Sequence, residues 1–491
     1  MAKKLSSFRV GRVRAFLRGQ VWYLAYFEQG QRRQPRVGPD QQTARAMAAE
    51  INCQLEAGAP SSLGFQAIAF PALRDRWLDH HEHVRRSSLN TIGRYRSATK
   101  HLLDFVATVR PLKRVSDLHP IHVEEFIRHL RSRRVAPNGH KNSKKRVLRD
   151  SGVKFVLETC SSLMHFAQRQ RHLPPYTENP FRVVEINRIP IEDAKPVVAF
   201  TNEEQIALLA NCDDWQLPVF ATLMFTGLRP GELVHLLLPN DVDLKEGWLR
   251  VRNKPKLGWQ VKTRNERDIP LVPALWRLLG HAVGDRQSGP VFQQRRAASG
   301  HQAPLVDCSL RELEAQVERR FTFASQHEPE DSSERLVRKG ATQTVWRDLG
   351  ALKEDWVRKE FMALTSLMGL KEVTAPKTLR HTFATILQDG SVDPLIRNEL
   401  MGHAPMAQTS GGGLGMTTIY THTRPETKRR QLVSPAGFHV LAGQLVGHLH
   451  GIAEAVSGFE GDWVLCQLLQ PGGNIVFGHR FLDGRWHRSA T

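Results

Sequence analysis

Five short strings between residues 226 and 422 carry side chains that could act on a phosphate group. They read TGLRPGEL (226–233), VKTRNERDIPL (261–271), KTLRHTFA (377–384), LMGH (400–403) and TTIYTH (417–422). A guanidinium can hold two phosphate oxygens at once, and fixed guanidinium groups can neutralise the charge that builds on a phosphate while a bond breaks. A tyrosine oxygen is a competent nucleophile once its proton is removed. These residue types fit metal-free cleavage of a phosphodiester.

Each string taken alone has an ordinary structural explanation. Arg229 could be a surface arginine with Glu232 as its ion-pair or capping partner, and a lysine at a hairpin tip is usually just solvated. Basic residues at positions i and i+3 of a helix are common. The histidine of LMGH and the tyrosine of TTIYTH could be a capped core histidine and a half-buried tyrosine. Only the conjunction and order of the strings point to one site.

Together and in this order the strings resemble the catalytic domain of the tyrosine recombinases, the phage integrase family. TGLRPGEL, PKTLRHTFAT, LMGH and IYTH match the family almost letter for letter, and the resemblance covers about residues 197–430. It implies a catalytic set of Arg229, Lys262, Lys377, Arg380, His403 and Tyr420.

The resemblance also implies a role for each of these residues. Arg229 and Arg380 would neutralise charge on the nonbridging oxygens, and Tyr420 would attack to leave a 3′-phosphotyrosine and a free 5′-hydroxyl. Lys262 would protonate the departing 5′-oxygen, with Lys254 and Lys256 as fallback candidates. Rejoining reverses the step and needs neither ATP nor a ligase.

Two features depart from the family pattern. Lys377 stands where most relatives carry histidine. It would act as a base only if neighbouring arginines lower its pKa, and otherwise it would be another positive charge that binds the phosphate. His403 would donate a hydrogen bond to the phosphate. The link from His403 to Tyr420 spans 17 positions and contains the glycine-rich stretch 411–415, so we expect the tyrosine to lie on a mobile segment. Whether Tyr420 cuts DNA held by its own protomer stays open.

Composition points to a polyanionic partner. The 491 residues include 69 Lys and Arg against 49 Asp and Glu, a formal net charge of +20, which favours a nucleic acid and would also suit a ribosomal, chromatin-like or RNA-binding protein. Double-stranded DNA is the partner that the resemblance implies. The five cysteines are scattered and never spaced as CxxC, which argues against a disulfide framework or a zinc knuckle. We find no apolar run of transmembrane length and expect a cytoplasmic, nucleoid-associated protein with no cofactor.

The pattern of apolar residues predicts a multidomain, α-rich fold. Alternating residues 8–37 and a helix at 43–55 predict a small sheet-plus-helix module (1–58) that resembles arm-type DNA-binding modules. Helical segments near 71–82, 88–107, 121–133 and 143–170 predict an all-helical core-binding (SAM-like) domain (66–190), and residues 174–196 look like an extended connector. A capping box at Thr201 and Glu204 indicates the first helix of the mixed α/β catalytic domain (197–430). Within this domain we expect residues 286–348 to form an inserted, partly ordered surface region. A C-terminal tail (431–491) could dock on a neighbouring protomer.

Two further groups of residues invite a binding role. Lys144, Lys145, Arg146 and Arg149 lie in the predicted helix 143–170 and are candidate DNA contacts. His80 and His83, at i and i+3 of a helix, would suit a metal, but the chemistry proposed needs none, and neighbouring side chains diverge around a helix.

The sequence therefore predicts site-specific recombination, the integration or excision of a mobile element. By resemblance we expect a homotetramer on two synapsed sites, with DNA-bending or directionality proteins as possible partners. Two alternatives stay open: a type IB topoisomerase-like enzyme that relaxes DNA, and a catalytically inactive DNA-binding regulator.

Overall fold

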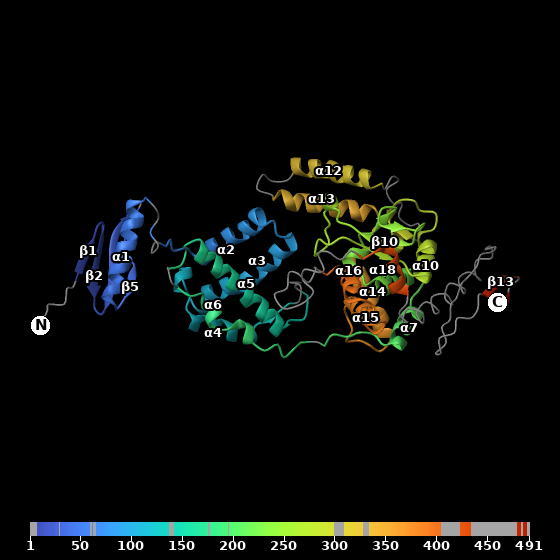
Figure 1. Ribbon diagram of the computed structural model, residues 1–491, viewed down its shortest axis with the longest axis horizontal. Helices are drawn as coiled ribbons and strands as arrows, with labels where there is room; N and C mark the ends of the chain where they lie inside the picture. Colours follow the sequence, from blue (N-terminus) through green and yellow to red (C-terminus); the bar gives the residue numbers. More distant parts are fainter. Residues whose placement is uncertain are drawn as a thin grey trace. The chain divides into compact units, whose positions relative to one another are not determined.

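The chain forms two compact units, Met1–Lys195 and Pro196–Thr491 (Figure 1). The computed structural model describes residues 7–28, 30–58, 61, 65–136, 142–174, 177–194, 196–298, 309–327, 333–403, 423–433, 479–482 and 485–488. Helices dominate the described residues, and a small sheet opens the first unit. The predicted α-rich chain with an N-terminal sheet module is confirmed. Among the described helices, none combines the length and apolar character that a bilayer crossing requires.

The N-terminal module is a five-stranded antiparallel sheet covered on one face by a helix. Its elements are β1 (Ser7–Val10), β2 (Val13–Arg18), β3 (Val21–Glu28), β4 (Gln31–Arg33), β5 (Arg36–Gly38) and α1 (Gln41–Glu56). Alternate residues of β2 and β3, such as Ala15 and Leu24, are buried with Ala48 of α1, as the period of two requires. Asp40 caps the helix by accepting a hydrogen bond from the Thr43 amide at 2.7 Å.

The rest of the first unit is a helical body around Trp77, Phe105 and Phe126, all buried. Its longer elements are α2 (Phe70–Asp79), α3 (Leu89–Asp104), α4 (Pro120–Ser132) and α5 (Asp150–Arg169). Single π-helical turns, His80–Val84 and Phe105–Val109, extend α2 and α3, and short 3-10 turns lie at Val115–Asp117 and Ile186–Arg188.

Two expectations for this unit were wrong in part. The helix predicted over 143–170 begins only at Asp150, because the preceding residues pair as β7 (Arg146–Val147) with β6 (Arg134–Val135) and direct their backbone hydrogen bonds there. The stretch 174–196 is not wholly an extended connector, because α6 (Pro180–Val183) folds back on the helical body. Phe181 is fully buried, and its apolar surface outweighs the helix-breaking prolines around it.

The second unit surrounds one buried helix with helices and a three-stranded sheet. The helices are α7 (Asn202–Ala210), α8 (Gln216–Thr226), α9 (Pro230–Leu233), α10 (Pro273–Val283), α14 (Glu354–Leu367), α15 (Lys377–Asp389), α16 (Pro394–Met401) and α18 (Pro425–Val433). The antiparallel sheet has the order β11 (Arg267–Pro270), β10 (Trp248–Val251), β9 (Val242–Asp243). The Thr201 capping box is present, with Glu204 accepting from the Thr201 amide at 2.9 Å.

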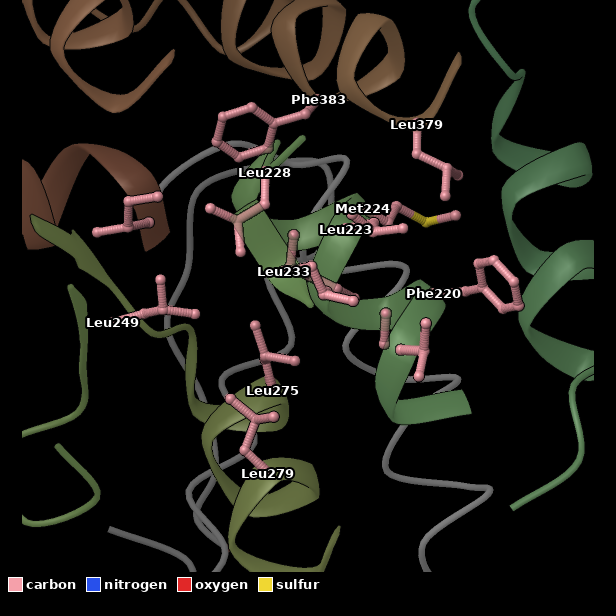
Figure 2. Close-up of a cluster of buried hydrophobic side chains, with 14 of the residues drawn as sticks. Phe220, Leu223, Met224, Leu228, Leu233, Leu249, Leu275, Leu279, Leu379 and Phe383 are labelled. Carbon is pink, nitrogen blue, oxygen red and sulfur yellow. The ribbon is translucent and has the colours of Figure 1, made fainter. Parts of the chain in front are cut away.

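The core of this unit lies around α8, every residue of which is buried. Figure 2 shows its apolar side chains among those of the neighbouring helices, with Leu379 and Phe383 of α15 on one side and Leu275 and Leu279 of α10 on another. The packing fixes the end of α8, where the first predicted catalytic string begins.

The predicted surface insertion contains more regular structure than its sequence indicates. Within 286–348 the structure has β12 (Gly289–Pro290), which pairs with β8 (Leu237–Leu238), then α11 (Arg295–Ala298), α12 (Leu310–His327) and α13 (Glu334–Asp348). We call the pair α12 and α13 the helical insert. Its residues Leu313, Val317 and Val345 form a small separate apolar cluster with Leu237 and Leu257. Near the C-terminus β13 (His479–Leu482) pairs with β14 (Arg485–Arg488).

Candidate active site

The turn after α8 presents Arg229. Gly227 ends the helix at φ +62°, and a Cβ there would lie 2.3 Å from Cδ1 of Phe383, so both backbone and space require glycine. The Arg229 side chain, 26% exposed, donates from Nη1 to Oε1 of Glu232 at 2.7 Å. Its guanidinium is thus oriented by the protein but open to a ligand.

Glu232 is buried and shared between two arginines. Arg267, also buried, donates from Nη2 to Oε2 of Glu232 at 2.6 Å and from Nε to the carbonyl of Leu400 at 2.8 Å. Burial alone would raise the pKa of Glu232, but hydrogen bonds and charge from Arg267, together with bonds from Arg229, outweigh it and lower that pKa. The carboxylate therefore stays ionised at neutral pH.

Arg380 joins three segments that lie far apart in the sequence. It projects from α15 and donates from Nη1 to the carbonyl of Gly227 at 2.6 Å and from Nη2 to the carbonyl of Met401. Burial, followed by repulsion from Arg229 and Arg267, lowers the pKa of Arg380 to about 10, so the side chain is still a cation at pH 7. The guanidinium is locked in place before any ligand binds.

His403 follows the end of α16. Gly402 turns the chain at φ +62°, and a Cβ there would lie 2.7 Å from Nη1 of Arg267. Burial lowers the pKa of His403, and the nearby charges of Arg380, Arg229 and Arg267 lower it further, so the imidazole is neutral at pH 7. The structure thus brings together three of the predicted catalytic residues, Arg229, Arg380 and His403.

Lys262 lies on the segment that connects β10 to β11, residues 252–266, which we call the lysine loop. Its side chain is exposed. On one side of it Thr263 donates from Oγ1 to the Gly402 carbonyl at 3.1 Å, and Asn265 donates from Nδ2 to the His403 carbonyl at 3.2 Å. The loop is therefore held against the segment that carries His403.

Neither fallback lysine is free to act in the same way. Lys254 is buried and pairs through Nζ with Oδ2 of Asp241 at 2.8 Å. Lys256 pairs with Glu314 of α12 at 3.0 Å. Lys262 remains the better candidate for the proton donor.

The other predicted residues differ in what the structure says of them. Lys377 is exposed at the first turn of α15, one turn before Arg380, and its charge helps to lower the pKa of His381, after burial. Tyr420, and the glycine-rich stretch before it, lie outside the described residues.

The candidate DNA contacts of the first unit, Lys144, Lys145, Arg146 and Arg149, are all exposed. They lie before and within β7 and just ahead of α5 rather than on a helix.

The local contacts of His80 and His83 do not support a metal site at these two residues. His83 lies 3.6 Å from Asp79, and the His80 ring packs on Phe166. Within the described ranges, no group of three or more His, Cys, Asp or Glu side chains could hold a metal ion.

Arg267 is the site residue to which the sequence pattern assigned no role. A signal was present, since Arg267 alternates with Ile269 on a strand whose inward side chains are apolar. An arginine at an inward strand position needs a buried partner. That partner is Glu232.

The chain resembles known proteins in sequence and in structure. Residues 199–426 match the model of the Phage integrase family. The tyrosine recombinase XerC of Rhodospirillum centenum is 26% identical over 76% of this chain and 93% of its own length, and XerC of Thermodesulfovibrio yellowstonii is 24% identical over 70% and 90%. A solved structure of the Tn1549 transposon integrase in complex with a circular intermediate DNA aligns with 74% of this chain and 99% of its own at 15% identity and a TM-score of 0.46. The family match covers the four segments that supply Arg229, Lys262, Arg380 and His403, so these residues lie in a domain that matches the Phage integrase family.

Proposed function

We propose that this protein is a site-specific recombinase that integrates or excises a mobile element through a 3′-phosphotyrosine intermediate. The observation that carries the proposal is the convergence of Arg229, Arg380 and His403, from three distant segments, on one cationic site. Such a site fits the extra negative charge of a phosphodiester at the moment of cleavage.

The chemistry follows from the state of each side chain. The Tyr420 hydroxyl releases its proton to solvent as its oxygen forms a bond to phosphorus, the bond from phosphorus to the 5′-oxygen breaks, and Lys262 gives its proton to that oxygen. Arg229 and Arg380 stabilise the nonbridging oxygens, and neutral His403 donates a hydrogen bond to one of them. Lys377 adds a further positive charge to the phosphate clamp. The reverse step, on a different strand, rejoins the DNA.

The chain after the tyrosine is anchored beside the site, which supports delivery of Tyr420 by the same protomer. Thr423 donates to Oε1 of Glu399 at 3.0 Å, and Lys428 pairs with Oε2 of Glu399 at 2.7 Å. Glu399 is two residues before Met401, whose carbonyl binds Arg380. Three residues of extended chain span at most about 11 Å, so Tyr420 is tethered within that distance of Thr423.

The N-terminal module offers a second surface for DNA. The sheet face away from α1 carries a stacked aromatic pair, Phe16 and Tyr23, with ring centroids 5.8 Å apart. Around the pair are exposed arginines from all strands except β3: Arg9, Arg14, Arg18, Arg32 and Arg36. A sheet face rich in arginine fits the phosphates and base edges of duplex DNA.

We assign residues 1–58 to an arm-type module and residues 66–190 to core binding, where Lys144, Lys145, Arg146 and Arg149 contact the duplex.

The reaction requires two DNA sites, so the assembly is proposed to be a homotetramer on synapsed DNA at the nucleoid, assisted by bending or directionality proteins. Light scattering of the protein with and without its sites tests the assembly. A protein that stays monomeric on two synapsed sites would contradict it.

The test of function is a covalent adduct. The protein is incubated with EDTA and without ATP on nicked duplexes from the DNA that flanks its gene, and denaturing gels are used to detect a protein–DNA species. We expect an adduct with the wild type and none with Tyr420→Phe. Tight binding to these fragments without an adduct would support the inactive regulator, and relaxation of plasmids without sequence preference would support the topoisomerase alternative.

A further inference from the structure

The lysine loop rests on the helical insert. Leu257 of the loop is 2% exposed and packs with Leu313 of α12 and Val345 of α13 in one apolar cluster. Trp346 of α13 donates from Nε1 to the Leu257 carbonyl at 3.0 Å. The insert therefore holds the loop through both apolar contacts and a hydrogen bond from a tryptophan side chain to the loop backbone.

The approach between loop and insert is close. Gly258 adopts φ +71°, and a Cβ at this position would lie 2.8 Å from Oγ1 of Thr342 on α13. Beside it Lys256 pairs with Glu314 of α12 at 3.0 Å. Loop and insert thus fit each other along both helices of the insert.

An aromatic cluster connects this contact to the turn that carries Arg229. The Trp259 ring stacks on His235 with centroids 5.0 Å apart and an interplanar angle of 19°, and the Trp346 ring meets His235 edge-on at 4.8 Å. His235 in turn donates from Nδ1 to the carbonyl of Gly231, in the helix that Arg229 caps, at 2.6 Å. The insert, the loop and the arginine turn therefore pack as one body.

Lys262 lies between two fixed points of the loop. Lys254 and Trp259 exchange backbone hydrogen bonds that close the outer part of the loop, and Val261 donates from its amide to Oδ1 of Asn253 at 2.9 Å. Beyond the lysine, Thr263 is bonded to Gly402. Both sides of Lys262 are therefore held, by Asn253 and Gly402, and the outer part of the same loop is held on the insert through Leu257.

We propose that the helical insert is a positioning element for the proton donor, with Trp346 of the insert and Trp259 of the lysine loop as the positioning residues, which hold Lys262 at the 5′-oxygen of the scissile phosphate. The inference rests on the proposed function, in which Lys262 protonates that oxygen. Misplacement of a catalytic group by about 1 Å can slow a reaction about 100-fold.

The experiment compares two leaving groups in single-turnover cleavage of a nicked duplex. One substrate has the natural 5′-oxygen, and the other has sulfur at that bridging position. With sulfur, the bond from phosphorus to sulfur breaks to release a thiolate, which needs no proton because a thiol has a pKa of only about 8.5. The variants are Trp346→Phe, which keeps a ring beside His235 but removes the donor to Leu257, Trp346→Ala, and the matched control Gln343→Ala, exposed on the same helix.

We expect Trp346→Ala to cleave the oxygen substrate about 10- to 100-fold more slowly and the sulfur substrate at close to the wild-type rate, with a smaller effect in Trp346→Phe and none in Gln343→Ala. A misfolded variant would instead lose both substrates equally. Wild-type rates for Trp346→Ala on oxygen would overturn the inference, and so would equal losses on both substrates in a Trp346→Ala or Trp346→Phe protein that keeps the wild-type circular dichroism spectrum. Lys262→Ala separates it from the proposed function: if sulfur fails to rescue that variant, the role of Lys262 as proton donor is wrong, whatever the insert does.

Discussion

The pair Glu232–Arg267 should contribute more to stability than any exposed ion pair of the second unit. Both side chains are almost fully buried, 3% and 4% exposed, and their oxygens and nitrogens approach to 2.6 Å. Glu232→Gln keeps the shape but leaves a buried guanidinium without its counter-ion, beside Arg229 and Arg380. Removal of one partner of a buried pair costs about 3 to 5 kcal/mol. We expect a loss of that size in the free energy of unfolding.

The assay is urea unfolding followed by circular dichroism, with Glu312→Gln as the matched control. Glu312 forms a pair with Arg319 on α12 that is far more exposed, 32% and 62%, and loss of such a pair costs at most about 1 kcal/mol. The double variant Glu232→Gln/Arg267→Met should recover part of the loss, because no charge is then left buried without a partner. A Glu232→Gln variant as stable as Glu312→Gln would refute the reasoning.

Four further outcomes follow from the same contacts. Arg380→Lys keeps the charge, but a lysine cannot donate to both backbone carbonyls. Cleavage, measured by adduct yield, should fall about 100-fold or more, while DNA binding at low salt, measured by gel shift, should persist. Burial lowers the pKa of His235 to about 4, below the value of about 6.5 in the unfolded chain, so the unfolded state binds more protons between these two pH values. The free energy of unfolding should therefore fall by up to about 3 kcal/mol as the pH drops from about 6.5 to 4. The His235→Phe variant should show a smaller pH dependence of that free energy in urea titrations. Arg14→Ala should weaken binding to a second DNA site and reduce the salt dependence of that binding, log K against log[salt], by about one unit, with cleavage of a core duplex unchanged. A mixture of Arg229→Ala and Tyr420→Phe proteins should stay inactive on a duplex with one cleavage site, whereas recovered adduct would show that the tyrosine comes from a neighbouring protomer.

Local conformation within the predicted strings could be anticipated where neighbouring residues decide it. The glycine of TGLR, for example, is favoured by the positive φ of the turn after α8, and that requirement shows in the residue type itself. The Thr201 capping box is likewise complete within four residues. Where short spacing decides the conformation, the pattern suffices.

The misjudged parts depend on partners far away in the sequence. Residues 146–147 pair with 134–135, so their strand cannot be read from the helix-like segment in which they stand. Phe181 is buried by helices distant in the chain, and this reverses the meaning of a proline-rich stretch. The helical insert has few buried apolar residues, and it packs on Leu257 of a loop that lies 56 positions before Leu313 and 88 before Val345. Such contacts are invisible in a single sequence.

The groups that accept hydrogen bonds from the arginines explain why the site keeps a net positive charge. Arg380 is oriented by two neutral carbonyls, which fix a guanidinium without cancelling its charge, and a guanidinium has five N–H donors, so three remain for phosphate. Glu232 does carry a negative charge and orients Arg229, but Arg267 compensates it from the buried side. Three arginines and one glutamate leave a formal charge of +2. Arg267 is thus the residue that lets a carboxylate align Arg229 while the phosphate still meets two uncompensated positive charges.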